Sequence, residues 1–227
     1  MRILLVGAGG VGGAIATASA RREFFEHCTV ADIDGGRATA VAEGTGDRRF
    51  DAATVDASDA GAIAELARSV RADVVMNAAD PRFVMPIFDA AFAADAHYLD
   101  MAMSLSRRHP TEPFSRTGVM LGDEQFARSA DWEARGRLAL CGIGVEPGLS
   151  DIFARYARDH LFSEVHEVGV RDGANLEVEG YAFAPTFSIW TTIEECLNPP
   201  LIWERERGWY RSEEHTSELQ SHLNLVC

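Results

Sequence analysis

Glycines recur in a fixed pattern close to the amino terminus of this chain. The run Gly7-Ala8-Gly9-Gly10-Val11-Gly12 ends an apolar segment over residues 2–8 and leads into an alanine-rich segment over residues 11–22. A continuous apolar segment of this length is typical of a strand that is buried on both faces of a parallel sheet. Small residues on every side of the second segment are typical of a helix that packs tightly against a sheet. The pattern therefore predicts a strand, a glycine turn and a helix in direct succession.

The glycines of this run meet three different steric demands. Gly7 permits the tight turn out of the strand, Gly9 lets the backbone come close to a diphosphate, and Gly12 lets the helix lie close to the sheet. The beginning of the helix offers free N–H groups and the positive end of the helix dipole to phosphate oxygens. We predict that a dinucleotide contacts this loop through Gly7, Gly9, Gly10, Val11 and Gly12.

An acidic residue closes the second predicted strand, residues 27–33. The carboxylate of Asp32 can accept hydrogen bonds from both hydroxyls of an adenosine ribose and would repel a 2′-phosphate. The predicted cofactor is therefore NAD or NADP, with NAD favoured. Arg37 keeps NADP open, because an arginine nearby can pair with a 2′-phosphate. The structural alternative is that the glycines and Asp32 only shape a turn.

Strands and helices alternate along most of the chain. The periodicities predict strands over residues 2–8, 27–33, 50–55, 73–79, 97–101 and 138–143, and helices over residues 11–22, 37–43, 60–70, 84–94, 123–135 and 149–161. Such alternation implies right-handed βαβ units, so the expected fold class is α/β with a doubly wound parallel sheet of the Rossmann type. Residues 104–122 carry two prolines and no periodicity, and we interpret them as a surface excursion or flap.

The alternation ends near residue 162, where a different pattern begins. Residues 165–171 alternate apolar and polar side chains, which is typical of a strand with one solvated face. We therefore predict a dinucleotide-binding domain over residues 1–162. The start of a second, incomplete α+β substrate domain is predicted over residues 163–210.

Residues 211–227 change character abruptly after Trp209 and Tyr210. The stretch from Arg211 to His222 reads as the in-frame translation of a common short-read sequencing adapter. On this interpretation residues 211–227 are a non-native tail, and the natural sequence stops near Tyr210. The alternative is a polar, solvated C-terminal helix.

Further polar residues follow the later strands, at the edge where ligands of doubly wound sheets bind. Asp56 is predicted to face the adenine, and Asn77 with Ala78 to border the cofactor. Asp100 ends the fifth strand and is predicted to hold a substrate ammonium or a catalytic water. Each of these three polar side chains has a structural alternative as a turn-forming or helix-capping residue. Gly148 is predicted to line the nicotinamide pocket through its backbone.

Composition argues against several classes of protein. The formal net charge of −14 disfavours a nucleic-acid or anionic-membrane partner, because both bind to basic patches. No segment approaches the roughly 20 apolar residues that span a bilayer, and the opening residues do not resemble a signal peptide. Cys28, Cys141 and Cys196 lie in apolar runs and read as reduced core thiols, so a cytoplasmic location is expected. No metal-ligand cluster, Ser-His-Asp arrangement or P-loop lysine is present, and no metal site is predicted.

Six segments together resemble the saccharopine dehydrogenase-like family, and their order is kept: GAGGVGG, TVADID, NAADP, HYLDMA, GVEPGLSD and FSIWTTIEE. The resemblance covers nearly all of residues 1–210. The family includes saccharopine reductases, lysine dehydrogenases and carboxynorspermidine synthases, whose members are generally longer, so a C-terminal truncation is implied. The resemblance implies a nicotinamide cofactor and the oxidation or reduction of a C–N bond through an imine. It also implies cofactor contacts at Gly7, Gly9, Gly12 and Asp32, a cleft bordered by Asn77, Asp100 and Gly148, and a substrate pocket with Ser188, Trp190 and Thr191.

These observations favour an NAD(P)-dependent oxidoreductase that acts on the C–N bond of an amino acid or its imine adduct, with Asp100 in an electrostatic role. Two alternatives stay open. A non-catalytic nucleotide-sensing Rossmann module would retain NADH without turnover of any amine, and a carbonyl or lipid reductase would oxidise NADPH without a nitrogen donor. The expected partner is a small amino-acid-like substrate, and a homodimer of the full-length form stays open. Because the second domain is incomplete, we expect this chain to bind cofactor weakly and to turn over little.

Overall fold

The computed structural model describes residues 1–169, 179–180, 199 and 201–211. These residues contain a six-stranded sheet of order β3-β2-β1-β4-β5-β6 and a two-stranded sheet formed by β7 and β8. Every neighbouring pair in the larger sheet is parallel, and the strand order reverses between β1 and β4. This order is that of the doubly wound dinucleotide-binding fold. The predicted fold class is confirmed.

The strands of the larger sheet are β1 (Arg2–Val6), β2 (His27–Asp32), β3 (Phe50–Thr54), β4 (Val74–Asn77), β5 (His97–Asp100) and β6 (Ala139–Leu140). The helices between them are α1 (Gly10–Ser19), α2 (Gly35–Gly44), α3 (Ala60–Ser69), the short η1 (Pro81–Phe83), α4 (Val84–Ala93), α5 (Asp123–Phe126) and α6 (Ser129–Ala134). The elements that follow are α7 (Leu149–His160), β7 (Leu201–Glu204) and β8 (Gly208–Arg211).

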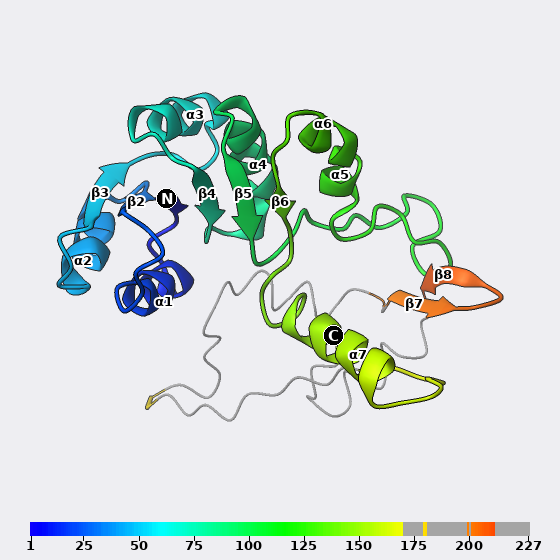
Figure 1. Ribbon diagram of the computed structural model, residues 1–227. Helices are drawn as coiled ribbons and strands as arrows, with labels where there is room; N and C mark the ends of the chain where they lie inside the picture. Colours follow the sequence, from blue (N-terminus) through cyan, green and yellow to red (C-terminus); the bar gives the residue numbers. More distant parts are fainter. Residues whose placement is uncertain (170–178, 181–198, 200, 212–227) are drawn as a thin grey trace. The chain divides into compact units, whose positions relative to one another are not determined.

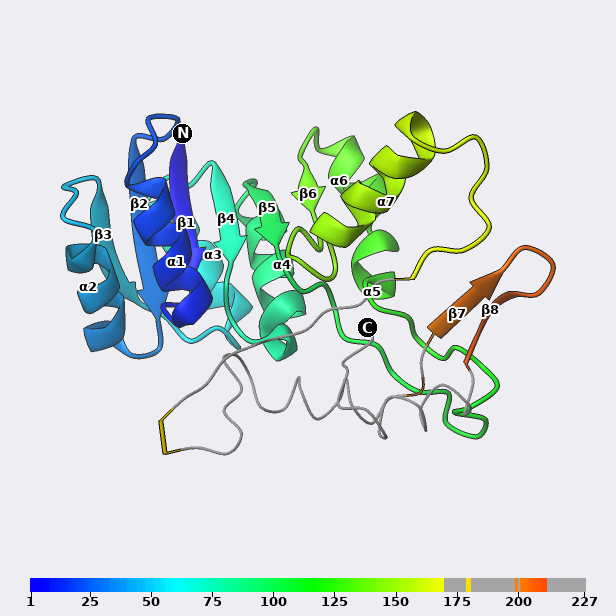
Figure 2. The same ribbon diagram turned by 90° about the horizontal axis from the view of Figure 1, so that it is seen from below.

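Helices cover both faces of the larger sheet, because its central strands are apolar on both sides. In β1, Leu4 and Val6 face the core shared with α3 and α4, whereas Ile3 and Leu5 face the core shared with α1 and α2. Figures 1 and 2 show these two helical layers on opposite sides of the sheet. Alternate side chains of the continuous apolar segment thus point to opposite faces of the sheet, and each face is buried against its own helices.

One predicted strand is much shorter in the structure, and one predicted helix is divided in two. The strand predicted over residues 138–143 is limited to Ala139–Leu140, since Gly142 turns with φ +67° and its N–H donates to the side chain of Asp100. The helix predicted over residues 123–135 is divided into α5 and α6. The first buries Gln125, and the second buries Trp132 in the aromatic core.

The strand predicted over residues 165–171 is wrong for the part that the structure describes. Residues 165–169 form no strand, and residues 170–171 lie outside the described residues. Alternation alone does not make a strand, because each strand needs a neighbour for its backbone hydrogen bonds. Residues 166–169 are exposed, so no apolar face is buried there.

The chain divides into two compact units. The first comprises Met1–Leu105 and Leu121–Leu149, and the second comprises Ser106–Met120 and Ser150–Cys227. The predicted boundaries after residues 162 and 210 stay predictions, although Arg211 already forms part of β8. In the second unit, Ile152, Phe153 and Tyr156 on α7 are each more than half exposed. Within the described residues, no helix is both long and apolar enough to cross a membrane.

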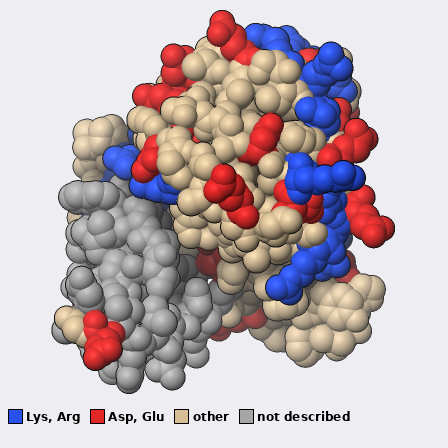
Figure 3. All heavy atoms as spheres, turned by 90° about the vertical axis from the view of Figure 1, so that its left-hand side faces the viewer, with Lys and Arg blue, Asp and Glu red and all other residues tan. Residues whose placement is uncertain are grey.

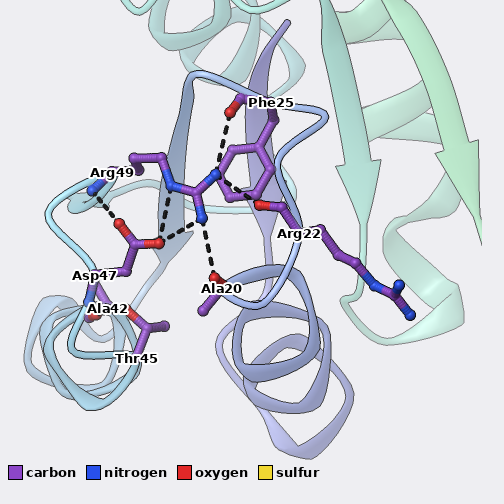
Figure 4. A network of polar contacts seen from close by, with 7 residues as sticks. All are labelled: Ala20, Arg22, Phe25, Ala42, Thr45, Asp47 and Arg49. Carbon is purple, nitrogen blue, oxygen red and sulfur yellow. Dashed lines mark hydrogen bonds and ion pairs between the residues drawn. The ribbon is translucent and has the colours of Figure 1, made fainter.

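The guanidinium of Arg49 forms a clamp, a set of contacts that links the segments after α1 and α2 at the outer edge of the first unit (Figure 4). Arg49 donates to the backbone oxygens of Ala20 at 3.0 Å and Arg22 at 2.8 Å, and to the carboxylate of Asp47 at 2.6 Å. Its guanidinium also lies 4.2 Å from the ring centre of Phe25. Because these carbonyls follow α1 and Asp47 follows α2, one side chain holds the ends of two helices together.

Opposite charges lie beside one another on the surface near α2. Figure 3 shows acidic and basic side chains interspersed on the face that lies to the left in Figure 1. At the beginning of α2, the exposed side chains of Arg37 and Asp34 form an ion pair at 3.9 Å. Exposed pairs of this kind contribute little to stability. This surface is therefore mixed in sign.

We expect Arg49→Met to lower the melting temperature by several degrees at neutral pH, because carbonyl and carboxylate acceptors lose their donor. The side-chain hydrogen bond from Arg49, followed by its backbone N–H, holds the pKa of Asp47 below its usual value. The ionised Asp47 carboxylate stabilises the folded state above its unfolded-state pKa of about 3.9, and this stabilisation is lost as the pH falls through the lower folded-state pKa. The difference in melting temperature between Arg49→Met and the wild type should therefore become smaller below about pH 4. Calorimetry across pH, with the exposed Arg48→Met as control, measures this; equal melting temperatures for both variants would contradict it.

Candidate functional site

The register of the sheet brings the ends of four strands into one row. Ala31 pairs with Val6, Val6 with Asn77, and Asn77 with Asp100. Since parallel strands end at the same edge, the loops that follow β1, β2, β4 and β5 all leave from this row. The glycine loop and the predicted polar residues Asp32, Asn77 and Asp100 therefore belong to one edge of the sheet.

Two glycines of the loop are required by close backbone packing. Gly7 has φ +106°, and a Cβ at this position would lie 2.6 Å from the backbone oxygen of Ala78. A Cβ on Gly12 would collide with the backbone oxygen of Gly7. By contrast, a Cβ on Gly9 or Gly10 would meet nothing within 4 Å. The loop thus has a packed side against the sheet and an open side.

The open side of the loop is the beginning of α1. The first helical hydrogen bond runs from Gly13 N–H to the Gly9 oxygen at 2.8 Å. The N–H groups of Gly10, Val11 and Gly12 therefore have no acceptor one turn earlier in the helix. The first turn contains no acidic side chain, and Gly9 supplies no side-chain cap. These donors, with the helix dipole, suit the oxygens of a diphosphate.

Asp32 braces the glycine loop from the neighbouring strand. Its side chain is 10% exposed. One carboxylate oxygen accepts from Ala8 N–H at 2.8 Å, and the other accepts from Asp34 N–H at 2.9 Å. Arg37 lies 3.7 Å from the second oxygen, and its side chain is 54% exposed. The sequence did not indicate the bond to Ala8, which fixes the carboxylate beside the loop.

Asn77 and Ala78 lie at the end of β4, on the packed side of the loop. The carbonyl oxygen of the Asn77 side chain accepts from Ala79 N–H at 2.9 Å, and its amide donates to the Tyr98 hydroxyl at 3.1 Å. Ala78 donates its N–H to the Val6 oxygen at 2.8 Å. Asn77 is only 3% exposed. It therefore performs the turn-forming role named as its alternative, and its contact with a cofactor stays a prediction.

Asp100 lies at the centre of a buried polar cluster and is 1% exposed. Its Oδ2 accepts from the Tyr98 hydroxyl at 2.8 Å and from Gln125 Nε2 at 2.7 Å. Its Oδ1 accepts from Gly142 N–H at 2.7 Å and from Met103 N–H at 3.2 Å. Four internal donors thus surround the carboxylate. Its predicted contact with a substrate ammonium or a catalytic water stays a prediction.

Two groups near Asp100 keep their protons, the buried hydroxyl of Tyr98 and the half-buried thiol of Cys141. Burial raises the pKa of the Tyr98 hydroxyl far above its usual value, and the charge of Asp100 raises it further. Burial raises the pKa of the Cys141 thiol to about 12, again with help from Asp100. At neutral pH both are therefore neutral, so the phenol can donate to Asp100 and the thiol is not a nucleophile.

Asp56 and Gly148 have local structural partners. The Oδ1 of Asp56 accepts from the N–H of Ser58 at 2.8 Å and from its hydroxyl at 2.7 Å. The backbone bond, followed by the hydroxyl bond, lowers the pKa of Asp56. Gly148 has φ +132°, and a Cβ there would lie 2.7 Å from the Gly142 oxygen. The predicted roles of Asp56 at the adenine and Gly148 at the nicotinamide stay predictions.

The remaining predicted positions and features lie elsewhere. Ser188, Trp190 and Thr191 lie outside the described residues. The described part of the chain contains no group of three or more His, Cys, Asp or Glu side chains arranged to hold a metal ion. Two surface hollows flank Gly46 and Asp47, before β3 begins. They lie at the opposite end of the sheet from the glycine loop.

The chain matches a known protein family and several known proteins. The family described as saccharopine dehydrogenase NADP binding domain matches residues 3–140. The chain is 28% identical to the carboxynorspermidine synthase of Vibrio alginolyticus, over 90% of this chain and 50% of that protein. It is 29% identical to the carboxyaminopropylagmatine dehydrogenase of Synechocystis sp., over 86% of this chain and 46% of that protein. The chain thus spans about half the length of these relatives.

A solved structure shares the fold. Saccharopine dehydrogenase (L-Glu forming) from Saccharomyces cerevisiae is similar with a TM-score of 0.53 and 20% sequence identity, over 70% of this chain and 30% of that one. The family match also agrees with the predicted cofactor class, NAD or NADP, and with the resemblance of the six sequence segments. The glycine loop, the braced Asp32 and the family match lead to one conclusion: the chain belongs to the saccharopine dehydrogenase NADP binding domain family.

Proposed function

We propose that the chain is the cofactor-binding part of an NAD(P)-dependent oxidoreductase that acts on the C–N bond of an amino acid or its imine adduct. The observation that carries the proposal is the juxtaposition of the α1 N-terminus, the open side of Gly9 and Gly10, and the carboxylate of Asp32. These groups match a diphosphate and its neighbouring ribose. The relatives named above support the class of reaction.

The residues present fit a nicotinamide dinucleotide at the edge of the sheet. The N–H groups of Gly10 and Val11 would hold the diphosphate, and the space beside Gly9 and Gly10 leaves room for its approach. Asp32 would accept the hydroxyls of the adenosine ribose. Because Asp32 ends β2, the adenosine half would lie over β1 and β2. The nicotinamide half would then extend past the point of reversed strand order, toward β4, β5 and β6.

When bound, the nicotinamide group supplies or accepts the hydride that reduces or oxidises the C–N carbon. The residues of the chain contribute mainly position, since hydride transfer depends on a fixed face and a short distance. We assign Asp100 an electrostatic role. Its buried carboxylate provides a fixed negative charge near the end of β5, which favours positive charge on the nitrogen of the substrate.

The carboxylate of Asp32 favours NAD over NADP. A 2′-phosphate on the adenosine ribose would be repelled by this carboxylate, which is held in place by Ala8 N–H. Arg37 is the one cation that lies within 4 Å of Asp32 among the described residues, and Asp34 also attracts it. NADP binding would therefore need Arg37 to leave these carboxylates for the phosphate.

The names of the relatives indicate a class of substrate. The two relatives are named for carboxylated amines, so we propose a small amine or amino acid as substrate. We also propose a cytoplasmic location. The free thiols of Cys28, which is buried, and of Cys141, which is half-buried, fit a reducing compartment. The formal net charge of −14 disfavours nucleic acid as a partner.

Gly12→Ala should weaken NADH binding at least about tenfold, because the new Cβ forces the turn away from the Gly7 oxygen. The matched control is Gly44→Ala, at the end of α2, where a Cβ meets nothing within 4 Å. Fluorescence titration of both variants with NADH measures the difference. Unchanged affinity in Gly12→Ala would refute the proposed role of the loop.

Asp32→Asn should raise the affinity for NADPH relative to NADH at least about fivefold, because a negative charge beside the 2′-phosphate is removed. Asn retains an oxygen acceptor for Ala8 N–H, so the loop should keep its brace. Parallel titrations with both dinucleotides give the ratio. A wild-type chain that prefers NADPH, with a ratio that Asp32→Asn leaves unchanged, would show that Asp32 does not select the cofactor.

The class of reaction can be tested by following absorbance at 340 nm. A protein of the relatives' length, with this chain as its cofactor part, should oxidise NADH or NADPH only when a carbonyl compound and an amine are both supplied. This chain alone should bind cofactor weakly and show little turnover. Oxidation without any amine would contradict action on a C–N bond, and rapid turnover by the chain alone would contradict its dependence on further sequence.

A further inference from the structure

We propose that Gln125 is a positioning residue for the nicotinamide half of the cofactor site, and that it acts through the buried carboxylate of Asp100. The proposal rests on the proposed function, because it assumes that a nicotinamide dinucleotide binds at the carboxyl edge of the sheet. No sequence pattern marks Gln125, which stands in the polar stretch Gly122-Asp123-Glu124-Gln125. Its importance follows from its contacts.

Both ends of the Gln125 side chain are used inside the protein. The amide nitrogen donates to Asp100 Oδ2 at 2.7 Å, and the carbonyl oxygen accepts from Ser104 N–H at 2.8 Å. Gln125 and Ser104 are only 2% and 1% exposed. The backbone oxygen of Ser104 in turn accepts from Gly122 N–H at 2.9 Å. One amide therefore joins α5, the turn after β5 and the end of β5 itself.

Asp100 passes this restraint to the neighbouring loop. Its Oδ1 holds Gly142 N–H at 2.7 Å, and its backbone oxygen accepts from Ile143 N–H at 2.9 Å. The loop after β6 is thus attached to Asp100 by two bonds. Gln125 supplies one of the two donors at Oδ2, and the Tyr98 hydroxyl supplies the other. Loss of one donor leaves a buried carboxylate short of partners, which is costly enough to make it move.

The position of this cluster relates it to one half of the cofactor. Asp100 ends β5, and Gly142 follows β6, so the cluster lies in the half of the sheet beyond the reversal at β4. The adenosine half is expected on the other side, at Asp32 and the glycine loop. Gln125 should therefore affect the nicotinamide half of a dinucleotide without affecting the adenosine half.

The experiment compares two ligands on the same variant. The wild-type chain and Gln125→Met, which keeps the length of the side chain but removes its donor, are titrated with NADH and with ADP-ribose. We expect Gln125→Met to weaken NADH binding at least about tenfold and to change ADP-ribose binding by less than about twofold. Equal losses for both ligands, or no loss for either, would overturn the role of Gln125.

Two further variants separate positioning from general loss of stability. Arg49→Met removes a clamp of similar extent at the far edge and should leave the ratio of the two affinities unchanged. Tyr98→Phe removes the other donor at Asp100 Oδ2 and should shift the ratio in the same direction as Gln125→Met. If Gln125→Met does not fold, Tyr98→Phe decides: an unchanged ratio would overturn the proposal.

The outcomes for the wild-type chain distinguish this inference from the function on which it rests. Binding of both ligands by the wild type, with equal weakening in the variant, would overturn only the role of Gln125. Binding of neither ligand by the wild type would overturn the proposed function and the role of Gln125 together.

Discussion

The close approach of three backbone segments at the end of β1 is the constraint on which the candidate site depends. Gly7, Gly12 and Ala78 come so near to one another that a Cβ on either glycine would meet backbone atoms. This contact brings the beginning of α1 to the edge of the sheet, and the Asp32–Ala8 bond fixes the acid beside it. One tightly packed turn thus places the free N–H groups at the beginning of α1 beside the carboxylate of Asp32.

The other half of the site is organised by a side chain instead of a turn. Asp100 accepts four hydrogen bonds, which gather the turn after β5, the loop after β6 and α5 around one carboxylate. A buried charge is tolerated here because each oxygen has two donors. The carboxyl edge of the sheet therefore carries a glycine turn at the end of β1 and a polar cluster at the end of β5.

The sequence predicted the fold well because its evidence is local. The spacing of apolar residues indicates the buried strands and the amphipathic helices, and the spacing of the glycines indicates the position of the first turn. The end of β6 could not be predicted, since Gly142 leaves the strand to bind Asp100, a contact between distant parts of the chain. The strand expected at residues 165–171 failed because alternation cannot reveal whether a neighbour exists.

How much of the candidate site the sequence can indicate depends on how local its contacts are. The spacing marks Gly7, Gly12 and Asp32 as candidates, whereas it does not mark Gln125, because the partners of Gln125 lie 25 and 21 positions away. Asn77 and Asp100 were recognised as residues at strand ends. Their burial against Tyr98 depends on the register between β4 and β5, which no single segment encodes.

A crystal structure of the chain with bound NADH would show directly where the cofactor lies. We expect the diphosphate against the N–H groups at the beginning of α1, the adenosine ribose at Asp32 and the nicotinamide toward the ends of β4, β5 and β6. A diphosphate bound elsewhere, for example in the hollows beside Gly46 and Asp47, would contradict this expectation.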